Sequence, residues 1–323
     1  MGLMSSSVFF TERRKINMKK GVNKNFFKDV AFSVRGLLFQ VIIISLITNF
    51  AGVLLTKNLK ESVYGMIIEE ADTLLGVIYL IVRDARNDCK VNMQKPKHSV
   101  KFVTLFNMLA CLALVQVLEE ILFYIMECGL DTHNYTMMLT DSVSTVGENN
   151  IIVALCIGII SPILEEITYR GILLKQLRKY GDWYALIITA ILFGLSHFTL
   201  SQVFVGILTG LLFGYITIRY GIKWSIFLHI INNFVIGVIL GNIFDVIRGN
   251  IGEYIWTTVN IVLAVYVAIM LIKSRKSICT SLVQRDNIKT ELLHTLRVPS
   301  FVIIITYSII TNIMMLQIFI QKT

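Results

Sequence analysis

Long apolar runs recur along the chain and are separated by short polar segments. About nine runs approach the roughly 20 residues that a helix needs to cross a bilayer. They cover residues 36–55, 63–82, 102–126, 151–168, 183–200, 203–219, 224–243, 254–272 and 300–320. The run at 63–82 is the weakest because Glu69, Glu70 and Asp72 interrupt it near its start. The pattern predicts an all-α, polytopic membrane bundle of about eight to nine transmembrane helices.

Charged residues between the runs predict the orientation of the chain. Residues 1–35 are basic and polar, and we expect them to form a cytoplasmic N-terminal tail before a membrane domain at 36–323. The segments 83–101 and 170–179 are also basic, whereas 128–150 contains no Lys or Arg. Positive charge gathers in cytoplasmic loops, so these segments alternate between the two sides. We therefore predict a multi-pass protein of the cell membrane with its N-terminus in the cytoplasm.

Composition supports the membrane assignment. Hydrophobic residues make up 55% of the 323 residues and charged residues only 16%, against about 25% charged in soluble domains. The net charge of +9 lies beside apolar runs and not in a stripe with aromatic residues, which argues against nucleic acid and for membrane lipids as partners. The five cysteines are scattered without a CxxC pair, which indicates neither a disulfide framework nor a thiolate metal site.

A cluster of charged residues ends the run at 151–168. Glu166 and Arg170 are four residues apart, so they share a helix face and can form an ion pair. Glu165 points about 100° away from Glu166. This geometry predicts a structural role for Glu166 with Arg170 and leaves Glu165 for proton transfer. Pro162 can open or kink the helix just before them. The alternative interpretation is a helix end whose charges lie in the membrane interface.

Two further runs carry histidines. Phe193 and His197 lie near the end of the 183–200 run, where a lone histidine is commonly a packing group with a hydrogen bond. His229 and Asn233 lie four apart in the 224–243 run and project from one face. Polar groups within lipid each need a partner. This pair suits the binding of an oxyanion or a ligand.

The three patterns together resemble a known family. EExxxR (Glu165, Glu166, Arg170), FxxxH (Phe193, His197) and HxxxN (His229, Asn233) follow one another on successive apolar runs, as in the CPBP family. That family includes the type II CAAX prenyl endopeptidases and the bacterial Abi proteins, which are linked to bacteriocin processing and self-immunity. The resemblance covers roughly residues 150–240.

The resemblance implies an intramembrane endopeptidase that cleaves a membrane-associated peptide or membrane protein. Glu165 would be the general base with His197 as its partner, His229 and Asn233 would form the oxyanion site, and Glu166 with Arg170 would support the helix. Because the chain has no HExxH signature, we favour a metal-free mechanism without a cofactor. If zinc is bound, its ligands would be Glu165, His197 and His229. An Ile-, Lys- and Asn-rich composition points to a bacterial source and away from a prenylated substrate.

Two other functions are open at this stage. The chain can be a non-proteolytic immunity or regulatory partner, or a transporter, although no inverted repeat is evident. The paired acids Glu69–Glu70 and Glu119–Glu120 lack an arginine four residues later, and we expect the first pair to be interfacial. The glycines at 206, 210 and 214 share one helix face, which predicts close helix packing without chemistry.

Overall fold

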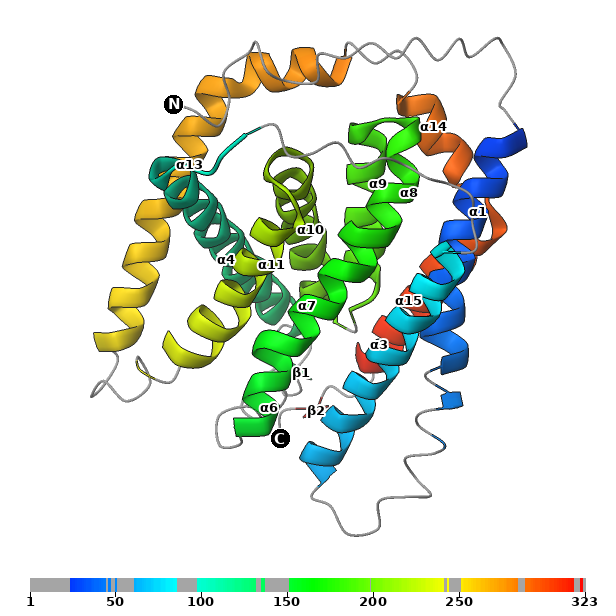
Figure 1. Cartoon of the computed structure of the whole chain (residues 1–323). Helices are drawn as coiled ribbons and strands as arrows, with labels where there is room; N and C mark the ends of the chain where they lie inside the picture. Colours follow the sequence, from blue (N-terminus) through cyan, green and yellow to red (C-terminus); the bar gives the residue numbers. More distant parts are fainter. Residues whose placement is uncertain are drawn as a thin grey trace.

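The protein is an all-helical membrane bundle (Figure 1). The computed structural model describes residues 24–44, 46–47, 50, 61–85, 98–131, 135–136, 151–197, 199–240, 243, 251–283, 288–316 and 320–321. Besides helices, these ranges contain two strands of two residues each, β1 (Tyr135–Thr136) and β2 (Ile320–Gln321), which pair antiparallel. The predicted fold class is confirmed.

The α-helices follow the predicted apolar runs with changed boundaries. They are α1 (Lys24–Leu38), α3 (Glu61–Ala85), α4 (Phe102–Asp131), α6 (Ile151–Leu155), α7 (Ser161–Glu166), α8 (Lys175–Leu177), α9 (Asp182–Leu195), α10 (Leu200–Tyr220), α11 (Ile222–Ile230), α13 (Ile251–Val283), α14 (Ile288–Thr295) and α15 (Pro299–Leu316). Segments of π-helix are η1 (Phe39–Ile44), η2 (Cys156–Ile160), η3 (Ile167–Leu174) and η5 (Ile231–Leu240), and η4 (Arg178–Tyr180) is a 3₁₀ turn.

Within the described residues, five helices are long and apolar enough to cross a membrane. A sixth results if α14 and α15, bent by 71°, count as one span. Three predicted runs are not among them. The run at 36–55 lies partly outside the described residues, α3 carries too many charges, and α9 has only 14 residues. The count of about nine is therefore not reached in the described part of the chain.

Residues 151–180 form one long helical element, built from α6, η2, α7, η3, α8 and η4. The basic segment 170–179 is not a break between elements, since the helix continues through it. Its charges are satisfied by neighbouring acids: Lys175 Nζ lies 3.5 Å from Asp84, Lys179 Nζ lies 2.6 Å from Asp29, and Arg178 pairs with Asp182. The expected opening of the helix near Pro162 takes the form of the π-segment η2 just before it.

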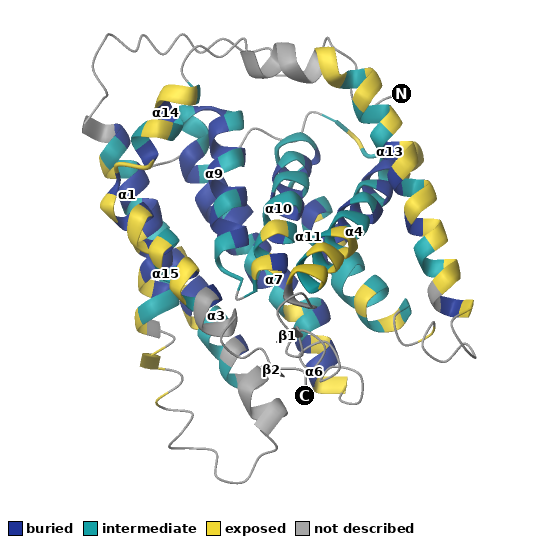
Figure 2. Cartoon of the chain, turned by 180° about the vertical axis from the view of Figure 1, so that it is seen from behind, coloured by how far each residue is buried: buried dark blue, intermediate teal, exposed yellow. Residues whose placement is uncertain are grey.

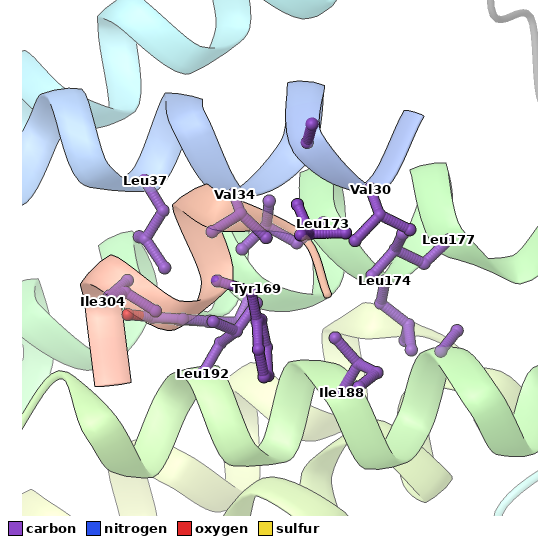
Figure 3. Packing of buried hydrophobic residues seen from close by; sticks show 14 of the residues in the cluster. Val30, Val34, Leu37, Tyr169, Leu173, Leu174, Leu177, Ile188, Leu192 and Ile304 are labelled. Carbon is purple, nitrogen blue, oxygen red and sulfur yellow. The ribbon is translucent and has the colours of Figure 1, made fainter. Parts of the chain in front are cut away.

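Helix α1 belongs to the folded bundle. Its residues Val30, Val34 and Leu37 are fully buried in a cluster with Leu173, Leu177, Leu192 and Ile304 (Figure 3). The predicted boundary of the basic tail at residue 35 thus falls inside a packed helix. The basic residues of this segment concealed an apolar face with helical spacing. The remainder of the predicted tail, residues 1–23, lies outside the described residues.

Outer surfaces of several helices are apolar and exposed. On α13, Ile255, Val259, Val262 and Ile269 are exposed, and Figure 2 shows exposed positions along this helix and along α15. Apolar surface of this extent faces lipid in a membrane protein, because lipid chains do not penalise it as water does. The chain is therefore described as a multi-pass membrane protein.

Helices α9 and α10 form a close hairpin. A Cβ added at Gly206 would lie 2.9 Å from Gly194 Cα, and one at Gly210 would lie 2.9 Å from Ala190 Cα. At Gly214 the nearest atom would be Cδ1 of Leu186. Glycine thus permits the backbones to approach, and the predicted packing surface is confirmed.

Candidate active site

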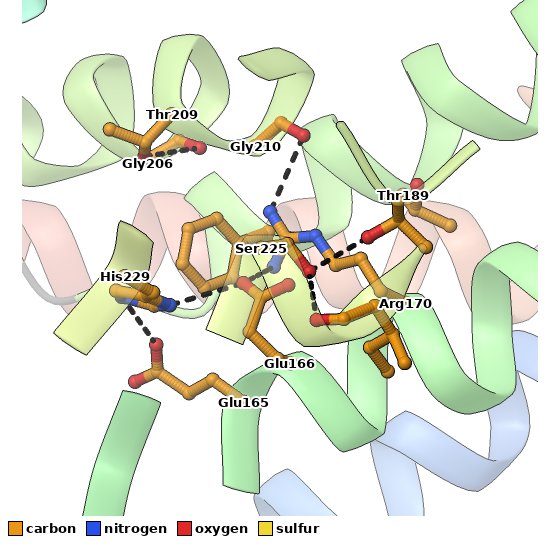
Figure 4. A network of polar contacts seen from close by, with 12 residues as sticks. Glu165, Glu166, Arg170, Thr189, Gly206, Thr209, Gly210, Ser225 and His229 are labelled. Atoms are coloured by element: carbon orange, nitrogen blue, oxygen red, sulfur yellow. Dashed lines mark hydrogen bonds and ion pairs between the residues drawn. The ribbon is translucent and has the colours of Figure 1, made fainter. Parts of the chain in front are cut away.

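The two adjacent glutamates of α7 face different surroundings. Glu166 is completely buried and lies 2.8 Å from Nη1 of Arg170, one turn later. The side chain of Glu165 is 28% exposed. Figure 4 shows the two carboxylates diverging from the helix. The predicted ion pair between Glu166 and Arg170 is confirmed, and Glu165 makes no ion pair with Lys or Arg among the described residues.

Arg170 ties this helix to the α9–α10 hairpin. Its Nη2 donates to the carbonyl oxygen of Gly210 at 3.3 Å, and its guanidinium lies 4.5 Å from the ring centroid of Phe193. The side chain is 1% exposed. A buried guanidinium is tolerated only when carboxylate, carbonyl and aromatic groups replace its water. Arg170 therefore fixes α7 and η3 against the elements that carry the other motifs.

His229 lies between the two carboxylates. Its Nδ1 is 3.1 Å from Oε1 of Glu166, and its Nε2 is 3.6 Å from Oε2 of Glu165. The ring also packs on Phe213, with centroids 4.7 Å apart. Because an ionised carboxylate only accepts hydrogen bonds, Nδ1 donates to Glu166. Its Nε2 is therefore directed towards Glu165 (Figure 4).

Asn233 lies in the π-segment η5 that follows α11. Its Nδ2 donates to the carbonyl oxygen of Ile157 at 3.4 Å, and its Oδ1 accepts from Asn232 at 3.0 Å. Ile157 lies in η2, where the π geometry displaces carbonyl groups from regular helical bonding. The pair His229 and Asn233 thus contacts the 151–180 helix at two levels.

His197 lies in the turn after α9, not within a membrane helix. Its Nδ1 bonds the carbonyl oxygen of Phe193 at 2.9 Å. The ring of Phe193 contacts both histidines, with centroids 5.1 Å from His197 and 6.0 Å from His229. The predicted run at 183–200 is therefore broken at Leu195. Because α9 ends at Leu195, residues of all three motifs lie around the ring of Phe193.

The predicted pairing of Glu165 with His197 is not seen as a direct contact. No hydrogen bond or ion pair joins them in the part of the chain that the structure describes, and the imidazole nearest to Glu165 belongs to His229. A three-ligand zinc site formed by Glu165, His197 and His229 does not fit either. Among the described residues, no three His, Cys, Asp or Glu side chains converge as metal ligands would.

The contact that Glu70 makes was not predicted from the sequence. Its carboxylate accepts a hydrogen bond from Ser161, one turn before Glu165, and the side chain is buried. Glu70 therefore faces the protein interior, and the interfacial position expected of the Glu69–Glu70 pair stays a prediction. The partners are 91 residues apart, and no spacing pattern links them. Of the second pair, Glu120 is exposed on α4 and Glu119 is half-buried.

Comparisons with known proteins support the motif analysis. Residues 147–235 match the family model described as type II CAAX prenyl endopeptidase Rce1-like. This range contains every residue of the three motifs. Neither the curated proteins nor the solved structures gave a match.

Proposed function

Since residues 147–235 belong to the Rce1-like group of type II CAAX prenyl endopeptidases within the CPBP family, we propose that this chain is an intramembrane endopeptidase in which Glu165 activates the attacking water. The observation that carries the proposal is that the two adjacent carboxylates have different surroundings. Glu166 is neutralised by Arg170 in the interior, whereas Glu165 is partly exposed beside His229. A general base needs access to water and a carboxylate not already committed to a cation.

The reaction begins with proton transfer from water to the carboxylate of Glu165. The oxygen of that water forms a bond to the carbon of the scissile carbonyl, whose oxygen takes up the negative charge. Collapse of the tetrahedral intermediate breaks the C–N bond, and the proton held by Glu165 passes to the leaving amine. His197 serves as the second proton carrier. Its Nδ1 is held by the carbonyl of Phe193, so its Nε2 is available for the exchange.

His229 and Asn233 stabilise the oxyanion. Nδ1 of His229 is held by Glu166, and its Nε2 lies on the side of Glu165, where a hydrogen bond from it can reach the oxyanion. The second hydrogen on Nδ2 of Asn233 adds a neutral donor, because its first is used on Ile157. Preorganised donors of this kind account for a large share of catalysis in acyl transfer.

The substrate is a membrane-associated peptide. The family match makes a lipidated C-terminal peptide the first one to test, although the composition of the chain points away from a prenylated substrate. The positive-inside pattern of the basic residues supports a cell-membrane location with the N-terminus in the cytoplasm. Membrane lipids are its permanent neighbours. No step of the proposed reaction uses a metal or another cofactor.

The test is cleavage of a quenched fluorescent peptide with a farnesylated C-terminus by the full chain in lipid nanodiscs. We expect Glu165→Gln to lower turnover by about 10²–10⁴-fold, because the amide cannot accept the proton. Glu120→Gln, on the exposed side of α4, is the matched control and should retain wild-type turnover.

Equal turnover of the Glu165→Gln variant and the wild type would refute the assignment. Biological activity that persists in Glu165→Gln cells at normal membrane level would support an immunity or regulatory protein instead.

A further inference from the structure

Asn312 lies far outside the family match and yet contacts the candidate site. It is near the end of α15 and only 9% exposed, in a helix whose outer face is apolar. Its Nδ2 donates to the carbonyl oxygen of Ser308 at 2.8 Å and to that of His197 at 3.5 Å. A side-chain amide has two N–H hydrogens, so one group serves both acceptors.

The carbonyl of His197 needs such a donor. His197 lies two residues after Leu195, the last residue of α9, and carbonyls just past the end of a helix have no intrahelical partner. Within a membrane an unsatisfied carbonyl costs several kcal/mol if no other group bonds it. The side chain of His197 is held by Phe193 of the preceding helix α9, whereas its backbone is held from α15.

Helix α15 offers firm support for this contact. Its residues Phe301 and Ile304 are buried in one cluster with Leu192, Phe193 and Tyr169 (Figure 3). The position of Asn312 is therefore fixed relative to α9.

Packing alone would not favour asparagine here. Oδ1 of Asn312 is buried and has no hydrogen-bond partner among the described residues. A buried acceptor without a partner is unfavourable, and leucine would fill a similar volume without that penalty. The hydrogen bond from Nδ2 of Asn312 to the carbonyl of His197 explains why asparagine occupies this position.

We propose that Asn312 is a positioning residue that holds the His197 turn in its reactive place through the carbonyl of His197. The inference rests on the proposed peptidase function for its kinetic consequence. It adds a residue of α15, the last described helix of the chain, to a site whose other residues all lie within the matched range 147–235.

The variant Asn312→Leu tests it, with Asn260→Leu as the control. Asn260 is also a membrane-buried asparagine, at 3% exposure, but lies on α13. With the farnesylated probe we expect Asn312→Leu to lower kcat by about ten- to a hundredfold at nearly unchanged KM, since misplacing a reacting group acts on turnover. Asn312→Gln, which keeps the amide donor, should recover part of the loss. Asn260→Leu should keep wild-type kcat.

A second measurement separates this inference from the peptidase proposal. In histidine-labelled protein, the imidazole NMR signals of His197 are identified by their loss in His197→Gln. They should shift or broaden in Asn312→Leu and stay in place in Asn260→Leu. If the wild type cleaves the probe but both leucine variants behave alike in kcat and in spectrum, the role of Asn312 is overturned and the peptidase stands. If the wild type cleaves neither the farnesylated probe nor the same peptide without the lipid, the peptidase proposal fails and the spectrum alone decides on Asn312.

Discussion

Arg170 brings a full positive charge into the interior of a membrane protein, and a single carboxylate compensates most of it. Glu166 lies 2.8 Å away, while the carbonyl of Gly210 and the ring of Phe193 complete its surroundings. Such a pair contributes little net stability compared with apolar residues of the same volume. Removal of one partner is a different matter, because the remaining charge stays buried.

The ion pair yields a stability prediction. We expect Glu166→Leu or Arg170→Met to lower the free energy of unfolding by about 3–5 kcal/mol. The double variant should recover most of that loss, since it leaves no charge unpaired. Thermal unfolding of the purified variants in detergent measures both effects. Additive losses in the double variant would show that the two side chains act independently.

At this scale the sequence predicted the Glu166–Arg170 pair but not the position of His229. Four-residue spacing within one helix determines the first contact. The contacts of His229 with both glutamates depend on how two helices pack, because His229 and Glu166 are 63 positions apart in the sequence. The same reason hid the contact between Glu70 and Ser161.

Helix α10 restricts the position of the His197 side chain, although His197 belongs to the turn after α9. A Cβ on Gly206 would meet Gly194 Cα at 2.9 Å and Nδ1 of His197 at 3.1 Å. Neither neighbour can give way without moving the turn after α9. At Gly214 the obstacle is the tip of the Leu186 side chain, which can change its rotamer.

Alanine substitutions in this helix should therefore differ in their effect. We expect Gly206→Ala to lower turnover by about tenfold or more through displacement of His197. Gly214→Ala should stay close to the wild type and gain from the higher helix propensity of alanine. Turnover of the farnesylated probe and the thermal midpoint, measured side by side, check both expectations. A similar loss in both variants would point to general hairpin packing as the cause.

Element boundaries were predicted less well than element existence. The charges at 170–179 were interpreted as a basic segment between two apolar runs. They form the end of a helix whose lysines reach Asp84 and Asp29 on other elements. A count of charges along one segment cannot show partners supplied from elsewhere.

On the scale of the whole molecule, helices α1 and α15, which are far apart in the sequence, both pack against the matched region. Helix α1 and helix α15 pack on one another and on the 151–180 and α9 elements. Neither belongs to the family match at 147–235. The site is thus supported by parts of the chain that its motifs do not identify.

Neighbouring residues of α1 test this support. Val34 is fully buried, whereas Arg35 is exposed. We expect Val34→Asp to lower the free energy of unfolding by more than about 2 kcal/mol, because it buries a polar group without a partner. Arg35→Asp should change it little. Membrane levels and thermal midpoints of the two variants give the comparison, and equal behaviour would place α1 outside the cooperative unit.

The early end of α9 has a consequence for the surrounding bilayer. Fourteen residues of α-helix extend about 21 Å, whereas the hydrocarbon layer is about 30 Å thick. If Asp182, paired with Arg178, marks one surface, His197 remains well below the other. For hydrolysis at that depth, water must reach His197, and a bilayer that is locally thinned around the short helix α9 gives it access. Cleavage should therefore be faster in vesicles of short-chain monounsaturated phosphatidylcholine than in long-chain ones, and a rate that ignores acyl-chain length would contradict this.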